Sequence, residues 1–124
     1  MEHVLPLLVE QALAARDQQA AVLRQAQGAL QQARATLERL QAFRLECLSR
    51  SPAATLGRAD GAALADYQRF VTRLDDAIAS QGQEASRRQG AVAHQQQLLQ
   101  QAQQRLLAFQ TLGGRYARQR ASRE

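Results

Sequence analysis

The sequence is poor in the residues that fill a compact globular core. Aromatic residues make up 4% of the 124 residues, tryptophan is absent, and Pro6 and Pro52 are the only prolines. A compact core needs large apolar side chains, so this composition argues against an ordinary globular domain. The chain is rich instead in Ala, Gln, Leu and Arg, which lose little conformational entropy in a helix. The composition therefore predicts one small all-α domain built from long helices.

Residues that bind metals or carry out chemistry are also scarce. Cys47 is the only cysteine, and His3 and His94 are the only histidines. A single cysteine cannot form an internal disulfide, and two histidines far apart in the sequence do not make a metal-binding set. No glycine-rich phosphate loop is present, and no pair of carboxylates has a cleft around it. We therefore expect no enzymatic activity, metal, cofactor or small-molecule substrate.

Long apolar runs are missing as well. The stretch MEHVLPLLVEQ has no basic segment before its apolar part and is interrupted by Pro6, so we expect no signal peptide. No apolar run approaches the roughly 20 residues that a membrane-spanning helix needs.

Lysine is absent, and all 16 basic residues are arginines, which gives a net charge of +5. Such a charge suits an acidic protein surface, anionic lipid or nucleic acid. The arginines are interspersed with Asp, Glu and Gln, and the few aromatic residues form no stacking platform. This pattern argues against nucleic acid as the partner.

The chain is expected to form two helices joined by a connection. Pro6 suits a first helical turn, so the first helix is predicted over about residues 6–48. Ser, Pro, Gly and Asp gather in residues 49–60, which predicts a connection. The second helix is predicted over about residues 61–112. Two glycines open the remaining segment, 113–124, which is expected to be either a frayed tail or an extension of the helix.

Heptad repeats of mostly apolar residues run through both predicted helices. The repeat in the first helix comprises Leu5, Val9, Ala12, Arg16, Gln19, Leu23, Ala26, Leu30, Ala33, Leu37, Leu40, Arg44 and Cys47. The repeat in the second comprises Leu64, Tyr67, Val71, Leu74, Ile78, Gln81, Ala85, Arg88, Val92, Gln95, Leu99, Ala102, Leu106 and Phe109. Sustained heptads of this kind are typical of coiled coils.

The two repeats also fit each other when the chain folds back near residue 55. Pairing a positions with d positions then places Leu5 opposite Leu106 and Leu37 opposite Leu74. The sequence therefore predicts an antiparallel coiled-coil hairpin. An intermolecular four-helix assembly is the alternative.

One apolar stripe lies beside the seam of this predicted hairpin. Phe70 and Ala77 flank the seam and form, with Leu74 and Gln81, a stripe at i, i+4, i+7 and i+11. Phe70 either covers the edge of the seam, against Phe43 or its neighbour Arg44, or belongs to a face that docks another protein.

A second apolar feature lies beyond the predicted pairing. In that register the second helix extends beyond the first from Phe109 onward. Leu112 and Tyr116 continue the heptad spacing of apolar residues but have no partner opposite them. Arg115 lies beside them. The segment is either a docking end for an acidic or apolar protein surface or a frayed tail.

Two segments resemble a known family. YQRFVTRLDDAIASQ, residues 67–81, is similar to the signature of the flagellar FliJ proteins, small coiled-coil components of the bacterial flagellar type III export apparatus. RLLAFQTLGGRYARQ, which begins at Arg105, resembles the same family, as do the length, the basic charge and the predicted hairpin. The resemblance implies a non-enzymatic protein whose hairpin is similar to the antiparallel coiled coil of the rotary ATPase gamma-subunit stalk.

The resemblance also implies partners within the export apparatus. These are the hexameric export ATPase, the cytoplasmic linker region of the export gate protein and the export chaperones. The protein would then be cytoplasmic and peripherally associated with the inner face of the cell membrane. A stalk of a virulence-type injectisome and a generic coiled-coil scaffold or adaptor are the alternatives.

Site residues follow from the same resemblance. The family's gate-contacting face carries Phe, Leu, Ala and His at spacings of four, three and four, and the matching residues here are Phe70, Leu74, Ala77 and Gln81. Glutamine in place of histidine keeps hydrogen-bonding capacity but does not titrate near neutral pH. The overhanging end would enter the ATPase ring through Phe109, Leu112, Arg115 and Tyr116.

Overall fold

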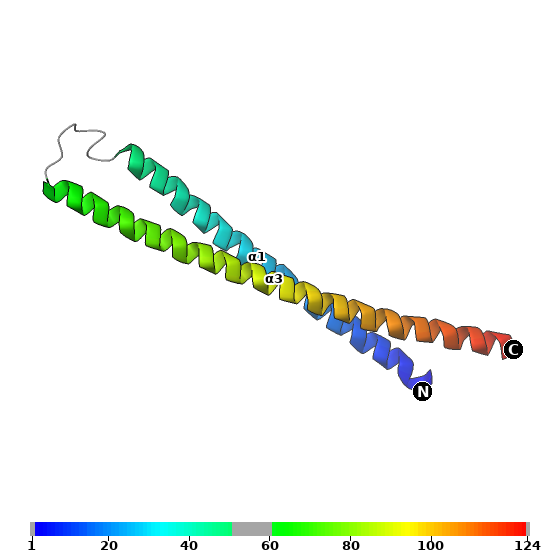
Figure 1. Ribbon diagram of the computed structural model, residues 1–124. Helices are drawn as coiled ribbons and strands as arrows, with labels where there is room; N and C mark the ends of the chain where they lie inside the picture. The colour runs from blue at the N-terminus through cyan, green and yellow to red at the C-terminus, as the bar shows by residue number, and fades with distance from the viewer. Residues whose placement is uncertain (1, 51–60, 124) are drawn as a thin grey trace. The chain divides into compact units, whose positions relative to one another are not determined.

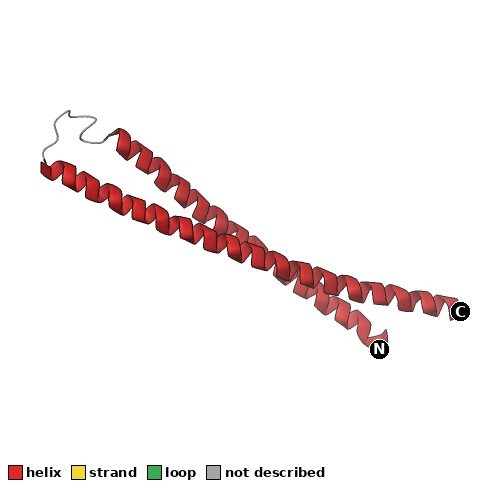
Figure 2. Cartoon of the chain, in the orientation of Figure 1, coloured by secondary structure: helices red, strands yellow, loops and turns green. Residues whose placement is uncertain are grey.

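Two long helices make up almost all of the computed structural model, which describes residues 2–50 and 61–123. One turn of 3-10 helix, Glu2–Val4, leads into helix α1, Leu5–Ser49, and helix α3 spans Gly61–Arg123 (Figures 1 and 2). The all-α prediction is confirmed. The predicted connection lies outside the described residues, apart from its first two positions.

Helix α1 begins and ends where its sequence favours it. Pro6 lies in the first turn, where the missing N–H of proline costs nothing because that group has no helical partner. At the other end the backbone N–H of Arg50 donates to the carbonyl of Cys47, 3.2 Å away. The hydroxyl of Ser49 donates to the carbonyl of Glu46. These two bonds satisfy carbonyls that the last turn leaves without helical partners.

Helix α3 continues through the Gly113–Gly114 pair to Arg123. Two adjacent glycines cost a helix roughly 2 kcal/mol relative to alanine. Packing offsets this cost, because Gly113 lies against α1: a Cβ added to it would stand 3.5 Å from Cδ2 of Leu5. Both glycines are half-buried, as is Tyr116 in the following turn.

By their contacts the two helices fall into two compact units. The terminal unit joins α1 through Gln27 with α3 from Gly90 onward, and the central unit joins α1 from Gly28 with α3 through Gln89. Within the central unit the two helices run antiparallel, since contacts with positions further along α1 come from positions earlier in α3. The hairpin prediction is confirmed.

The buried side chains all belong to the predicted heptad seams. They are Leu5, Ala12, Leu30 and Ala33 on α1, and Leu74, Val92 and Leu106 on α3. Each keeps between 5% and 7% of its surface exposed, and no described side chain falls below 2%. Each unit therefore has a single narrow seam for a core, as expected where only two helices pack together.

The pairing register of the terminal unit differs from the predicted one. Leu5 lies beside Gly113, one heptad further along α3 than its predicted partner, Leu106. Phe109 lines a hollow together with Leu8 and Ala12 of α1. The prediction that α3 has nothing opposite it from Phe109 onward was therefore wrong.

The central unit is shifted in the same direction. Leu37, predicted to lie opposite Leu74, lines a hollow with Gly82 and Ala85, at least one heptad further along α3. A displacement by a whole heptad keeps every a position opposite a d position. Apolar spacing alone therefore does not choose between such registers, which is why the predicted pairing failed.

Polar residues interrupt the seam of the terminal unit. Gln19 and Gln95 are half-buried, and the side-chain oxygen of each is shielded from solvent without a hydrogen-bond partner among residues 2–50 and 61–123. A buried amide oxygen without a partner costs about 1–3 kcal/mol. These residues hold the helices less firmly than apolar side chains would.

Candidate protein-docking site

A pair of phenylalanine rings forms an exposed apolar surface on the central unit. Phe43 on α1 and Phe70 on α3 meet edge to face, with ring centroids 6.1 Å apart and ring planes at 86°. Both rings remain open to solvent, at 45% and 44% exposure. We call them the aromatic pair. Phe70 therefore fits both interpretations of the sequence. Its ring packs across the edge of the seam, and part of the ring remains exposed for contact with another protein.

The other members of the predicted stripe lie differently. Leu74 is buried in the seam at 7% exposure, whereas Ala77 is exposed. The side-chain amide of Gln81 donates to the carbonyl of Ala33 across the seam, 3.0 Å away. The accessible part of the stripe is therefore Phe70 with Ala77, while Leu74 and Gln81 hold α3 against α1.

Phe43 was not among the predicted site residues. It lies outside the heptad seam of α1, and the sequence named it only as one of two residues against which Phe70 would cover the seam edge. The structure shows that contact. Its sequence signal was a large aromatic beside a seam position, the same signal that drew attention to Phe70.

An ion pair crosses the helices next to the aromatic pair. Nε of Arg44 on α1 lies 2.5 Å from Oδ1 of Asp75 on α3. The hydrogen bond from Arg44 holds the pKa of the Asp75 carboxyl below its usual range, and the same bond raises the pKa of the guanidinium. Both side chains are more than a third open to solvent, so water and salt weaken the attraction. The pair fixes the local register more than it stabilises the fold.

We expect Asp75→Asn to lower the melting temperature near neutral pH but not in acid. A carboxyl whose pKa is lower in the folded than in the unfolded chain stabilises the fold above its unfolded pKa of about 4. That stabilisation is lost as the pH falls through the lower, folded pKa. The melting curves of wild type and variant should therefore differ near neutral pH and converge in acid.

Asp76→Asn is the matched control for this experiment, since it removes the same charge from the neighbouring position. Asp76 forms no ion pair with any residue between 2–50 or 61–123. An equal loss in both variants would show that net charge, rather than the cross-helix pair, is responsible.

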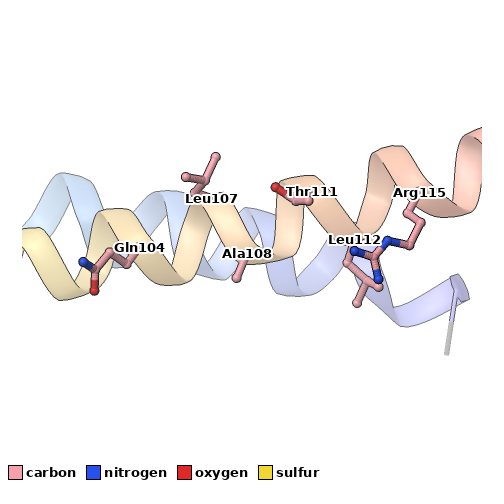
Figure 3. Close-up of a pocket in the computed structure, with 6 residues that line it drawn as sticks. All are labelled: Gln104, Leu107, Ala108, Thr111, Leu112 and Arg115. Carbon is pink, nitrogen blue, oxygen red and sulfur yellow. The ribbon is translucent and has the colours of Figure 1, made fainter.

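The second predicted set of site residues falls on two faces of α3. Phe109 faces α1 in the terminal unit, and the guanidinium of Arg105 lies over its ring, 5.9 Å from the centroid. Leu112 and Arg115 line an open hollow on α3 together with Leu107 (Figure 3). The structure does not bring Phe109 into that hollow.

Leu107 is a surface residue that sequence reasoning missed. It is 63% exposed although it follows the buried Leu106. Its position outside the heptad repeat was the available signal.

Neither metal chemistry nor a membrane span is suggested by the described ranges. Within residues 2–50 and 61–123, no three His, Cys, Asp or Glu side chains come together to hold a metal ion. No helix in the same ranges is long and apolar enough to cross a membrane. What the described surface offers is exposed apolar side chains carried on helices, a kind of surface that marks contact with other proteins.

Comparison with known proteins identifies the family. The family model described as "Flagellar FliJ protein" matches residues 1–124. No curated protein and no solved structure is similar enough to count as a match.

Proposed function

The chain belongs to the flagellar FliJ family and is thus a component of the flagellar export apparatus; on that premise we propose that it is a non-enzymatic stalk between the export ATPase ring and the export gate. In this proposal the central unit contacts the cytoplasmic linker region of the gate protein. The stalk also takes part in the traffic of export chaperones. It works in the cytoplasm, at the inner face of the cell membrane.

The aromatic pair is the observation that carries this proposal. Two large rings that stay more than 40% exposed on adjacent helices leave apolar surface in water. Exposed aromatic anchors of this kind carry much of the binding energy in protein interfaces. Phe43 and Phe70 support each other edge to face, so neither ring has to be ordered when a partner binds.

The terminal unit supports the proposed contact with the ATPase ring. Tyr116 and Leu112 are half-buried, and Arg115 lies between them in sequence and is exposed. We propose that these three residues meet the ring, while Phe109 contributes by holding α3 against α1. A narrow coiled coil suits this position, because it can present one face at a time to successive subunits.

The test is binding of wild-type and Phe70→Ala chains to the purified cytoplasmic part of the export gate protein. We expect Phe70→Ala to weaken binding about tenfold or more, since truncating an aromatic anchor costs at least about 1.4 kcal/mol. Circular dichroism of both chains should show the same helix content. Binding is measured by isothermal titration calorimetry.

Leu45→Ala is the matched control, because Leu45 is an exposed apolar residue of the same unit, at 69% exposure. It should bind as the wild type does. If the wild-type chain does not bind the gate at all, the protein is better described as a generic coiled-coil scaffold. If helix content and affinity fall together in Phe70→Ala, the ring serves the fold alone.

A further inference from the structure

The hollow on α3 lies on one face of that helix. It has a volume of about 520 Å³ and is lined by Gln104, Leu107, Ala108, Thr111, Leu112 and Arg115 (Figure 3). These positions follow the i, i+3, i+4, i+7, i+8, i+11 pattern of a single helix face. The opposite side of α3 carries Leu106, which is buried in the seam, and Gly113, which lies against Leu5 of α1. The hollow is therefore a second, outward face of the same helix.

The charge that α3 itself carries near this hollow is of one sign. From Gly90 to Arg123, α3 carries five arginines and no acidic residue. Arg105, Arg115 and Arg118 form no ion pair with any residue in the described ranges. Elsewhere, arginines on both helices pair with carboxylates, as Arg87 and Arg88 do with Glu84. These three arginines thus carry positive charge without a counterion among the described residues.

The chemistry of the hollow distinguishes among anionic partners. A nucleic acid would meet the arginines with its phosphates, but it would gain nothing from Leu107 and would find no aromatic ring in the hollow on which to stack a base. A second copy docked by the same face would bring arginine against arginine. An amphipathic helix with an apolar stripe and acidic flanks matches both features.

We propose that this face of α3 docks an acidic amphipathic helix of another protein. The face spans residues 104–115, which corresponds to about three helical turns and about 17 Å. Apolar side chains of the partner would lie over Leu107 and Leu112, and its carboxylates would pair with Arg115 and Arg118. This inference rests on the proposed function, because it names the chemical class of partner for the end of the protein that we expect to contact the export apparatus.

The test uses the full chain with the photo-crosslinking amino acid benzoylphenylalanine at Thr111, expressed in its host. After irradiation, mass spectrometry identifies the crosslinked peptide. Thr111 is exposed, so the chain should fold normally, which circular dichroism checks. Benzoylphenylalanine at Gln110, exposed on the same helix but outside the hollow, is the matched control.

We expect adducts at Thr111 on a segment with apolar residues at helical spacing and acidic residues beside them, and few at Gln110. Arg115→Glu should lower the yield about tenfold, because it replaces an attraction by a repulsion. Arg24→Glu makes the same charge change on α1 of the same unit and should leave the yield unchanged.

The proposal is overturned if Thr111 gives no adduct, if it links only to a second copy or to nucleic acid, or if Arg115→Glu has no effect. Gate binding through Phe70 is measured on the same preparations. Its persistence without an adduct would remove only this inference, whereas loss of gate binding in the wild type would remove the proposed stalk function.

Discussion

Replacing Leu106 with aspartate is expected to lower the free energy of unfolding by about 3 kcal/mol or more. Leu106 keeps only 5% of its surface exposed, in the seam between α3 and α1. A carboxylate placed there would lose its hydration. Urea unfolding followed by circular dichroism measures the effect.

Leu107→Asp is the matched control for this prediction. The two leucines are neighbours in the sequence, but Leu107 is 63% exposed. The same substitution there should change stability by no more than about 0.5 kcal/mol. Equal losses in the two variants would contradict the orientation of α3 in the terminal unit, and with it the separation of the seam from the outward hollow.

Leu74→Ala is expected to destabilise the protein by about 2–3 kcal/mol, near the lower end of the range for buried leucines. The seam is narrow, so the helices can partly close the space left by the lost methyl groups. Phe70→Ala should cost less, about 1 kcal/mol, since its ring is 44% exposed and loses mainly its contact with Phe43. Thermal and urea unfolding of the two variants give the comparison.

Gate binding should show the reverse order. At a temperature where both variants are folded, Phe70→Ala should weaken binding and Leu74→Ala should bind almost as the wild type does. If Leu74→Ala keeps its stability and loses affinity, then Leu74 turns outward to meet the partner and its burial in the seam is not maintained in solution.

The helices and their seam could be predicted from the sequence because both depend on local information. Composition favours helix at nearly every position, and the heptad repeat marks the residues that must be removed from water. Each of the buried side chains, from Leu5 to Leu106, lies at a predicted seam position. These features do not depend on how the two helices are aligned along each other.

The alignment could not be predicted in the same way. Registers one heptad apart bury the same kinds of residue, so the difference between them comes from specific contacts such as Arg44 with Asp75 and Gln81 with Ala33. Such contacts add little individually, and sequence spacing does not reveal them. The error carried through to the end of α3, where Gly113 has Leu5 beside it although the predicted register left that end without a partner.

The site was predictable to the extent that it lies off the seam. Phe70 was singled out because it is a large ring beside a filled stripe, and the structure leaves it exposed. Leu74 and Gln81 were grouped with it by their spacing along α3. Their burial and hydrogen bonding depend on α1, which a single-helix pattern does not include.

Glycine within the helices has a consequence for how the chain opens. A Cβ added at Gly28, Gly82 or Gly90 would meet no packed atom within 4 Å, so packing does not require glycine at these positions. Each gives up about 1 kcal/mol of helix stability relative to alanine. Backbone hydrogen bonds in these turns can therefore break in local fluctuations that leave the neighbouring turns intact. Their amide hydrogens should exchange with water ahead of those around the buried Ala12 and Leu74, which makes the interior of each helix, and not only its ends, a place where opening begins.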